Sequence, residues 1–67
     1  MNDWFKLYTT RNYAEAAIIK GMLEENNIAV IILNKQDSSY LVGDIELYVP
    51  FHLKDMAKQL LDRSLHN

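Results

Sequence analysis

Cysteine is absent from this 67-residue chain, so neither a disulfide framework nor a thiolate zinc site can stabilise it. Glycine occurs only at positions 21 and 43, which is too few for a phosphate-binding loop or a dinucleotide-binding fingerprint. The longest apolar run, residues 28–33, is far too short to cross a bilayer. These absences exclude nucleotide chemistry built on glycine-rich loops and leave packing and association as the sources of stability.

Positive charge is scarce and scattered. Nine acidic residues against seven basic ones give a net charge of -2, and the basic residues form no stripe. The chain therefore has little counterion-release drive toward nucleic acid, and its charge disfavours an anionic membrane surface. The N-terminal segment carries Asp3 and lacks a basic stretch followed by a long apolar run, so it does not resemble a secretory signal. We expect a cytoplasmic protein that binds neither nucleic acid nor membranes.

The length predicts a single domain, residues 1–67. A core of this size provides only roughly 3–5 kcal/mol of stability. We therefore expect help from a partner chain.

Local signals predict a first helix. Asn12 followed three residues later by Glu15 resembles a capping box, in which Glu15 reaches back to the cap. The helix should begin at Tyr13 and stop at residues 26–27, because asparagine is the best substitute for glycine in a left-handed C-cap. Its apolar residues exceed one stripe, and either a wide face covers the sheet or a second stripe contacts another subunit. This second stripe consists of Ala14, Ala17, Ile18 and Gly21.

Two further segments are predicted as strands at either end of a polar loop. Residues 28–33 are β-branched and nearly continuous, which is typical of a strand buried on both faces or lying against a neighbour. Residues 44–50 alternate, with Ile45, Leu47 and Val49 facing the core. Pro50 should end this strand because it has no N–H to donate.

Residues 4–9 also alternate and predict the first strand. Phe5 and Leu7 should lie on one face, and Trp4, Lys6 and Tyr8 on the other. At the C-terminal end, apolar residues at helical spacing predict an amphipathic helix. These residues are Leu53, Met56, Ala57, Leu60 and Leu61.

The resulting order, β-α-β-β-α, predicts an α+β fold. A right-handed crossover lets the third strand insert between the first two, giving a ferredoxin-like antiparallel sheet with two helices on one face. Its final strand is missing or supplied by a partner, so the first two strands form open edges. The face that no helix covers should carry four residues that we predict as an interaction surface. These are Trp4, Tyr8, Glu46 and Tyr48.

Three motifs, EAAIIKGMLEENNI, NKQDSSY and GDIELYVP, resemble a family of small bacterial domains of unknown function described as signal-transducing. The resemblance extends from Trp4 to about Leu61. It implies the PII-like branch of the ferredoxin-like fold and, by analogy, a role in signalling. The chain lacks the long loop with which PII proteins surround a nucleotide, so we expect no cofactor.

The loop of residues 34–43 is open to two interpretations. Its carboxylate, amide and hydroxyl groups could bind a polar ligand, whereas Asp and Ser in turns commonly bond their own backbone. The candidate ligand-binding residues are Asn34, Asp37, Ser38, Ser39 and Tyr40.

Catalysis has little support in the sequence. His52 and His66, together with a serine of the loop and Asp37 or Asp44, supply the residue types of a hydrolytic triad, but their spacing does not bring them together. Two distant histidines without cysteine match no usual metal-ligand spacing. We therefore predict neither an enzyme nor a metal site.

Two functions follow as expectations. The first is a non-enzymatic regulatory or protein-interaction module that forms a homo-oligomer through its open sheet. The alternative is a small-molecule sensor that binds a polar ligand at the loop.

Aromatic residues on an open sheet also resemble platforms for single-stranded RNA. Glu46 beside Tyr48 and the acidic balance favour a protein contact instead.

Overall fold

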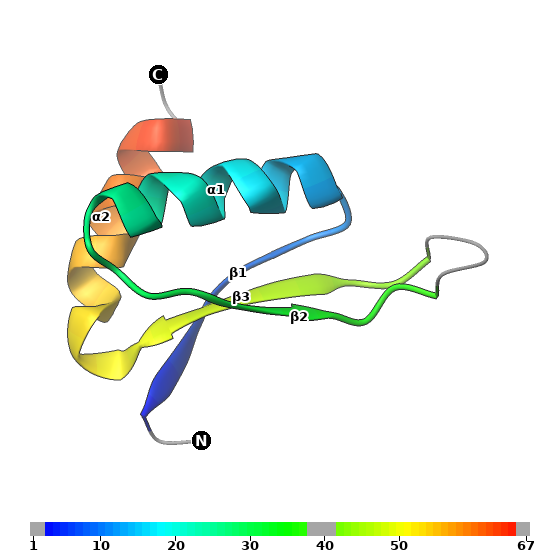
Figure 1. Cartoon of the computed structure of the whole chain (residues 1–67), viewed down its shortest axis with the longest axis horizontal. Coiled ribbons are helices and arrows are strands. Elements are labelled where there is room, and N and C mark those ends of the chain that lie inside the picture. The colour runs from blue at the N-terminus through cyan, green and yellow to red at the C-terminus, as the bar shows by residue number, and fades with distance from the viewer. Residues whose placement is uncertain (1–2, 38–41, 66–67) are drawn as a thin grey trace.

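The structure is a computed structural model and describes residues 3–37 and 42–65. Its strands form one antiparallel sheet in the order β1-β3-β2, so the last strand in the sequence lies at the centre (Figure 1). This confirms the predicted α+β fold, a ferredoxin-like sheet in which the described residues form no fourth strand, with β1 and β2 at the edges. The elements are β1 (Trp4–Thr10), α1 (Tyr13–Glu25), β2 (Ile31–Asn34), β3 (Ile45–Pro50), the 3₁₀ turn η1 (Phe51–Leu53) and α2 (Lys54–Leu65).

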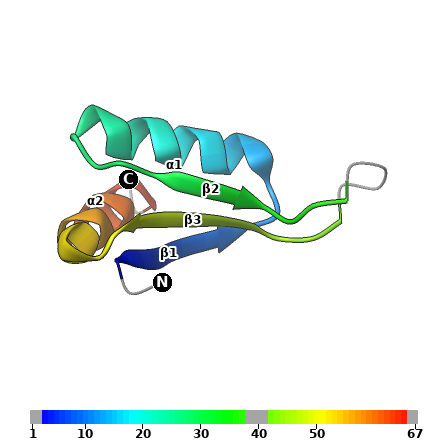
Figure 2. The same cartoon turned by 60° about the horizontal axis from the view of Figure 1, so that its bottom comes forward.

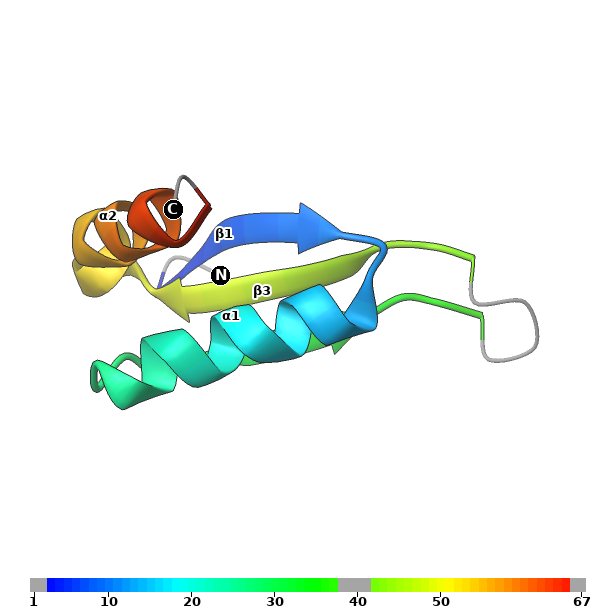
Figure 3. The ribbon, with the colours of Figure 1, turned by 90° about the horizontal axis from the view of Figure 1, so that it is seen from above.

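Both helices pack on one face of the sheet. Figure 2 shows α1 lying along the sheet, and the view from above shows α2 at one end of it, near the start of β1 (Figure 3). Apolar side chains from α1, β3 and α2, together with Ile28, fill the space between these layers, and no described helix covers the opposite face of the sheet. The buried apolar residues are Ala16, Ile19, Leu23, Ile28, Ile45, Leu47, Val49, Ala57 and Leu61.

The N-terminus of α1 lies where the sequence predicts it. The side-chain oxygen of Asn12 accepts a hydrogen bond from the backbone N–H of Glu15 at 3.1 Å, which satisfies a donor that has no partner within the helix. The second half of the predicted capping box is wrong. The carboxylate of Glu15 accepts instead from the hydroxyl of Tyr8 at 3.3 Å and so links α1 to β1.

The C-terminus of α1 is also confirmed. Asn27 has a φ of 63°, and its N–H donates to the carbonyl of Glu24 at 3.0 Å. The N–H of Ile28 donates to the carbonyl of Leu23 at the same distance, which completes a Schellman motif. This motif usually brings an apolar residue beyond the cap against the last turn, and Ile28 is indeed buried with Leu23. Ile28 is therefore part of the capping motif that follows α1, and it does not belong to a strand.

The strand predicted over residues 28–33 is shorter and displaced, because β2 covers Ile31–Asn34. Ile31 pairs with Tyr48 of β3, and the next hydrogen-bonded position in this register would place Ala29 opposite Pro50. Pro50 has no N–H, so the ladder stops at Tyr48. Of the two alternatives left open for this strand, burial on both faces is wrong, since Ile31 is 41% exposed and Leu33 is 44% exposed.

A β-bulge corrects the predicted faces of β1. Lys6 pairs with Tyr48, but the next pair joins Tyr8 to Leu47, so Leu7 is an extra residue in β1. Residues directly opposite in an antiparallel pair share a face, and Leu47 lies in the core. Tyr8 therefore lies on the helix-covered face and packs against the core, whereas the simple alternation placed it on the open face.

Two helical faces differ from the sequence prediction. The second stripe of α1, which comprises Ala14, Ala17, Ile18 and Gly21, is exposed along its whole length, so the interpretation of one wide face covering the sheet is wrong. Ile18 is 69% exposed. In α2, the predicted amphipathic helix is present, but Met56 is half exposed and only Ala57 and Leu61 are buried.

Candidate functional site

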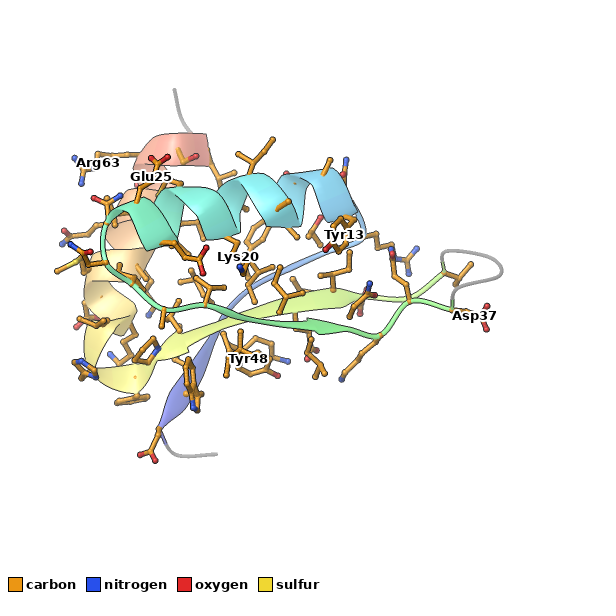
Figure 4. All side chains as sticks on the ribbon, viewed as in Figure 1. Tyr13, Lys20, Glu25, Asp37, Tyr48 and Arg63 are labelled. Atoms are coloured by element: carbon orange, nitrogen blue, oxygen red, sulfur yellow. The ribbon has the colours of Figure 1, made fainter. Side chains whose placement is uncertain are left out.

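The candidate site is the open face, the side of the sheet opposite α1 and α2. The strand pairing assigns residues to it, because Trp4 lies opposite Pro50, Ile31 and Lys6 opposite Tyr48, and Leu33 opposite Glu46. Figure 4 shows Tyr48 on this side of the sheet, away from α1. We define the open face by Trp4, Lys6, Ile31, Leu33, Glu46 and Tyr48.

Glu46 is the centre of a polar cluster on this face. The hydroxyl of Tyr48 donates to its carboxylate at 2.9 Å. Lys6 of β1 and Lys35, which follows β2, each place a side-chain Nζ 3.4 Å from one of its oxygens. These neighbours cover the carboxylate so completely that Glu46 is only 7% exposed, the one buried charged residue among those the structure describes. The cluster joins all three strands.

The cluster shifts the pKa values of Glu46 and Tyr48. The hydrogen bond from Tyr48 has the largest effect on Glu46 and lowers the pKa of its carboxyl group, and the two lysines act in the same direction against the opposing effect of burial. The same hydrogen bond is the main cause that raises the pKa of the Tyr48 phenol. Glu46 is therefore ionised and Tyr48 neutral at physiological pH.

This electrostatic arrangement is poorly suited to proton transfer. A general acid or base works best when its pKa lies near the operating pH, and both shifts move these groups away from neutrality. The charges of Lys6, Lys35 and Glu46 sum to one positive charge, and the carboxylate is already paired. The arrangement is suited to holding three strands in register and to presenting two half-exposed ammonium groups beside an apolar surface.

Ile31 and Leu33 are the residues of the open face that sequence reasoning missed. Their β-branched, continuous context is typical of a buried strand, so the sequence predicts burial. In the structure, β2 is an edge strand with a helix on one side only, and both side chains extend from the uncovered side. They add aliphatic side chains to the aromatic residues Trp4 and Tyr48 of the predicted surface. Of the four predicted surface residues, Trp4, Glu46 and Tyr48 lie on this face and Tyr8 does not.

The loop of residues 34–43 bonds largely to itself where the structure describes it. The side-chain oxygen of Asn34 accepts from the backbone N–H of Gln36 at 2.8 Å, and the N–H of Asp37 donates to the carbonyl of Val42 at 2.9 Å. These bonds are typical of a turn between paired strands. The predicted ligand residues Ser38, Ser39 and Tyr40 lie outside the described residues, so a ligand role of this loop stays a prediction.

A shallow depression lies beside this loop, at the start of α1. Gln36 closes one side of it and donates from its side-chain Nε2 to the carbonyl of Arg11 at 2.8 Å. The guanidinium of Arg11 lies 3.6 Å from the carboxylate of Asp44 across an exposed ion pair. Gln36 and Arg11, two of the residues that line this depression, therefore already have polar partners within the chain.

The residue types of a hydrolytic triad do not come together in the described part of the chain. Asp44 immediately precedes β3, and His52 follows it in η1, so the two residues lie at opposite ends of the central strand. Within residues 3–37 and 42–65, no group of three His, Asp or Glu side chains is placed to hold a metal ion. None of the described helices is long and apolar enough to span a membrane.

Comparison with known proteins identifies a family. A search of curated proteins and a search of solved structures return no significant match. A family model described as "Putative prokaryotic signal transducing protein" matches residues 4–64, which include β1, β2, β3 and almost all of α2. The match covers far more than half of the chain, and the chain therefore belongs to this family, DUF2007.

Proposed function

We propose that the protein is a non-enzymatic interaction module of prokaryotic signal transduction that self-associates through its open sheet. The observation that carries the proposal is the open face itself. It combines the half-exposed Ile31 and Leu33 with Trp4 and Tyr48, and the sheet beneath it ends in two edge strands. Exposed apolar patches and unpaired strand edges are liabilities unless a partner covers them. The family description supports the signalling context.

A protein partner suits this face better than a nucleic acid or a small molecule. The carboxylate at its centre pairs with both nearby lysines, so those cations are already partly neutralised. The face is one side of a β-sheet, whereas small-molecule sites are concave and enclose most of their ligand. Interfaces between proteins combine such aromatic and aliphatic groups with a polar rim.

Light scattering coupled to size-exclusion chromatography tests the proposal in a dilution series. The wild-type chain should associate more as its concentration rises, and Leu33→Asp should weaken association because it places a charge on the open face. Leu65→Asp is the matched control, since Leu65 is 47% exposed and lies at the end of α2 on the other side of the sheet. Circular dichroism checks that both variants fold. A wild-type chain that stays monomeric at about millimolar concentration, far above a micromolar Kd, would contradict the proposal.

A further inference from the structure

The free edge of β2 presents backbone groups in a defined pattern. The N–H of Lys35 donates to the carbonyl of Asp44 at 2.9 Å, and the β2–β3 register runs without a shift from Asn34 back to Ile31. In an antiparallel pair, alternate residues exchange hydrogen bonds with the partner strand. Leu33 and Ile31 therefore direct their N–H and carbonyl groups toward β3. The same groups of Ile32 and Asn34 point outward, where no other described strand lies.

The two edges of the sheet differ in how they are protected. A bulge interrupts β1 at Leu7, and Lys6 adds a charge to that edge. Natural proteins use such bulges and lysines to block edge-to-edge pairing. The β2 edge has neither feature, because residues 26–34 carry no charge and no proline and the strand has no bulge. Pairing with another strand is therefore favoured at β2 and opposed at β1.

We propose that β2 pairs with β2 of a second copy of this chain, antiparallel and about a two-fold axis at Ile32. The outward groups of Ile32 would bond to Ile32 of the second copy, and Ile31 would lie opposite Leu33 of the second copy. The three strands of each copy then form one continuous sheet, with both pairs of helices on the same side. The exposed Ile31 and Leu33 side chains would cover each other on the open face. This inference rests on the proposed function and identifies its partner and its edge.

Charge favours a second copy over a foreign peptide at this edge. A two-fold interface brings each residue near the axis close to its own copy, so any charge there meets a like charge. The strand is uncharged, and the Lys20–Glu24 pair on α1, joined at 3.2 Å, sums to zero. Lys35 at the end of the strand is already paired with Glu46. The strand therefore brings no unpaired like charges together near the axis, although each copy carries a net charge of -2.

The dimer should be weak and dependent on concentration. Stable interfaces bury about 800 Å² per partner. A four-residue strand paired with its copy, with two apolar side chains on each side of the axis, covers less than that. We therefore expect dissociation on dilution into the micromolar range, on the order of the Kd values of small transient interfaces.

Sedimentation equilibrium of the full chain tests the edge with a matched pair of variants. Ile31→Lys introduces a charge beside the axis and should weaken dimerisation at least tenfold, the effect of about 1.4 kcal/mol. Ile18→Lys makes the same change on the exposed stripe of α1, beside Ser64 and Leu65 at the end of α2, and should leave the dimer unchanged. Association that Ile31→Lys leaves intact, or that Ile18→Lys abolishes, overturns the β2 interface and keeps self-association. A wild-type monomer at every concentration overturns both.

The register has its own test in a double variant. In the proposed pairing, position 31 of one copy lies opposite position 33 of the other, so Ile31→Lys combined with Leu33→Glu creates two cross-strand ion pairs. The double variant should regain part of the association that Ile31→Lys loses, and salt should remove this gain. Melting curves confirm that all three variants fold. A double variant that stays as monomeric as Ile31→Lys overturns the two-fold axis at Ile32.

Discussion

Gly43 and Gly21 show how differently two glycines can act in one chain. Gly43 has a φ of +123°, and a Cβ there would lie 2.7 Å from the carbonyl oxygen of Lys35. Gly21 lies inside α1, and a Cβ at this position would meet no neighbouring group within 4 Å, so no described contact requires a glycine there. The first is needed for the turn into β3, and the second weakens a helix.

Alanine substitution should therefore have opposite effects at these positions. Gly43→Ala should reduce the free energy of unfolding by about 1–3 kcal/mol, because it combines a disfavoured backbone conformation with a steric clash. Gly21→Ala should increase it by about 0.5–1 kcal/mol by restricting the unfolded chain and improving helix propensity. Urea denaturation of both variants measures the difference. Equal shifts of the same sign would contradict this assignment.

Glu46 makes the stability of the fold depend on pH. Its pKa is lowered in the folded state, so the carboxylate stabilises the fold above the ordinary glutamate pKa of about 4.3, and this contribution is lost as the pH falls through the lowered value. Glu46→Gln removes the titrating group. The variant should be less stable than the wild type near neutral pH, and the difference should shrink below about pH 4.

Denaturation curves over a pH series measure this difference. Asp55→Asn is a suitable control, because Asp55 is exposed and its ion pair with Lys54 lies on the surface of α2. The control should show little change across the same range. A Glu46→Gln deficit that is constant with pH would mean that packing, and not ionisation, explains the role of Glu46.

At the scale of elements, the ends of α1 are set by short-range chemistry. Asn12→Ala should lower the free energy of unfolding by about 1 kcal/mol, since the N–H of Glu15 loses its acceptor. Asn12→Ser retains a capping oxygen and should keep most of the stability. Thermal denaturation of both variants compares them. Equal losses in the two variants would show that the amide of Asn12, and not its capping oxygen, is what matters.

The strands show the opposite behaviour, because each depends on residues far away in the chain. β2 begins at Ile31 because Pro50, on another strand, cannot donate to residue 29. Tyr8 changes face because β1 bulges against β3. These determinants are separated from the residues they affect by tens of positions, so alternation within a single segment cannot reveal them.

For the whole molecule, stability depends on a small core centred on β3. Leu47 is fully buried on the central strand. Leu47→Ala should cost about 2–5 kcal/mol through lost burial and the cavity left behind. This is comparable to the roughly 3–5 kcal/mol available to a domain of this size, so we expect a largely unfolded chain.

Leu33→Ala is the matched control for that experiment. Leu33 lies on the neighbouring strand but on the open face, where it is half exposed, so its truncation should cost much less. Circular dichroism at a fixed low concentration compares the two variants without a contribution from association. A folded Leu47→Ala variant would mean that the core tolerates a cavity better than its size suggests.

The sequence by itself determined the order of elements, both ends of α1 and the core face of β3. These features follow from capping residues, helical spacing and strand alternation, which act within a few residues. It also identified Trp4, Glu46 and Tyr48 as residues of the uncovered face, because the face on which each of them lies follows from the alternation of side chains along its own strand.

Only the tertiary structure decided the rest. The exposure of Ile31 and Leu33, the burial of Glu46 beneath Lys6 and Lys35, and the bulge at Leu7 each depend on which strand lies alongside. The physical reason is that pairing register and lateral cover are properties of neighbours in space. The same apolar strand is buried at the centre of a sheet and half exposed at its edge, and its own residues do not distinguish the two positions.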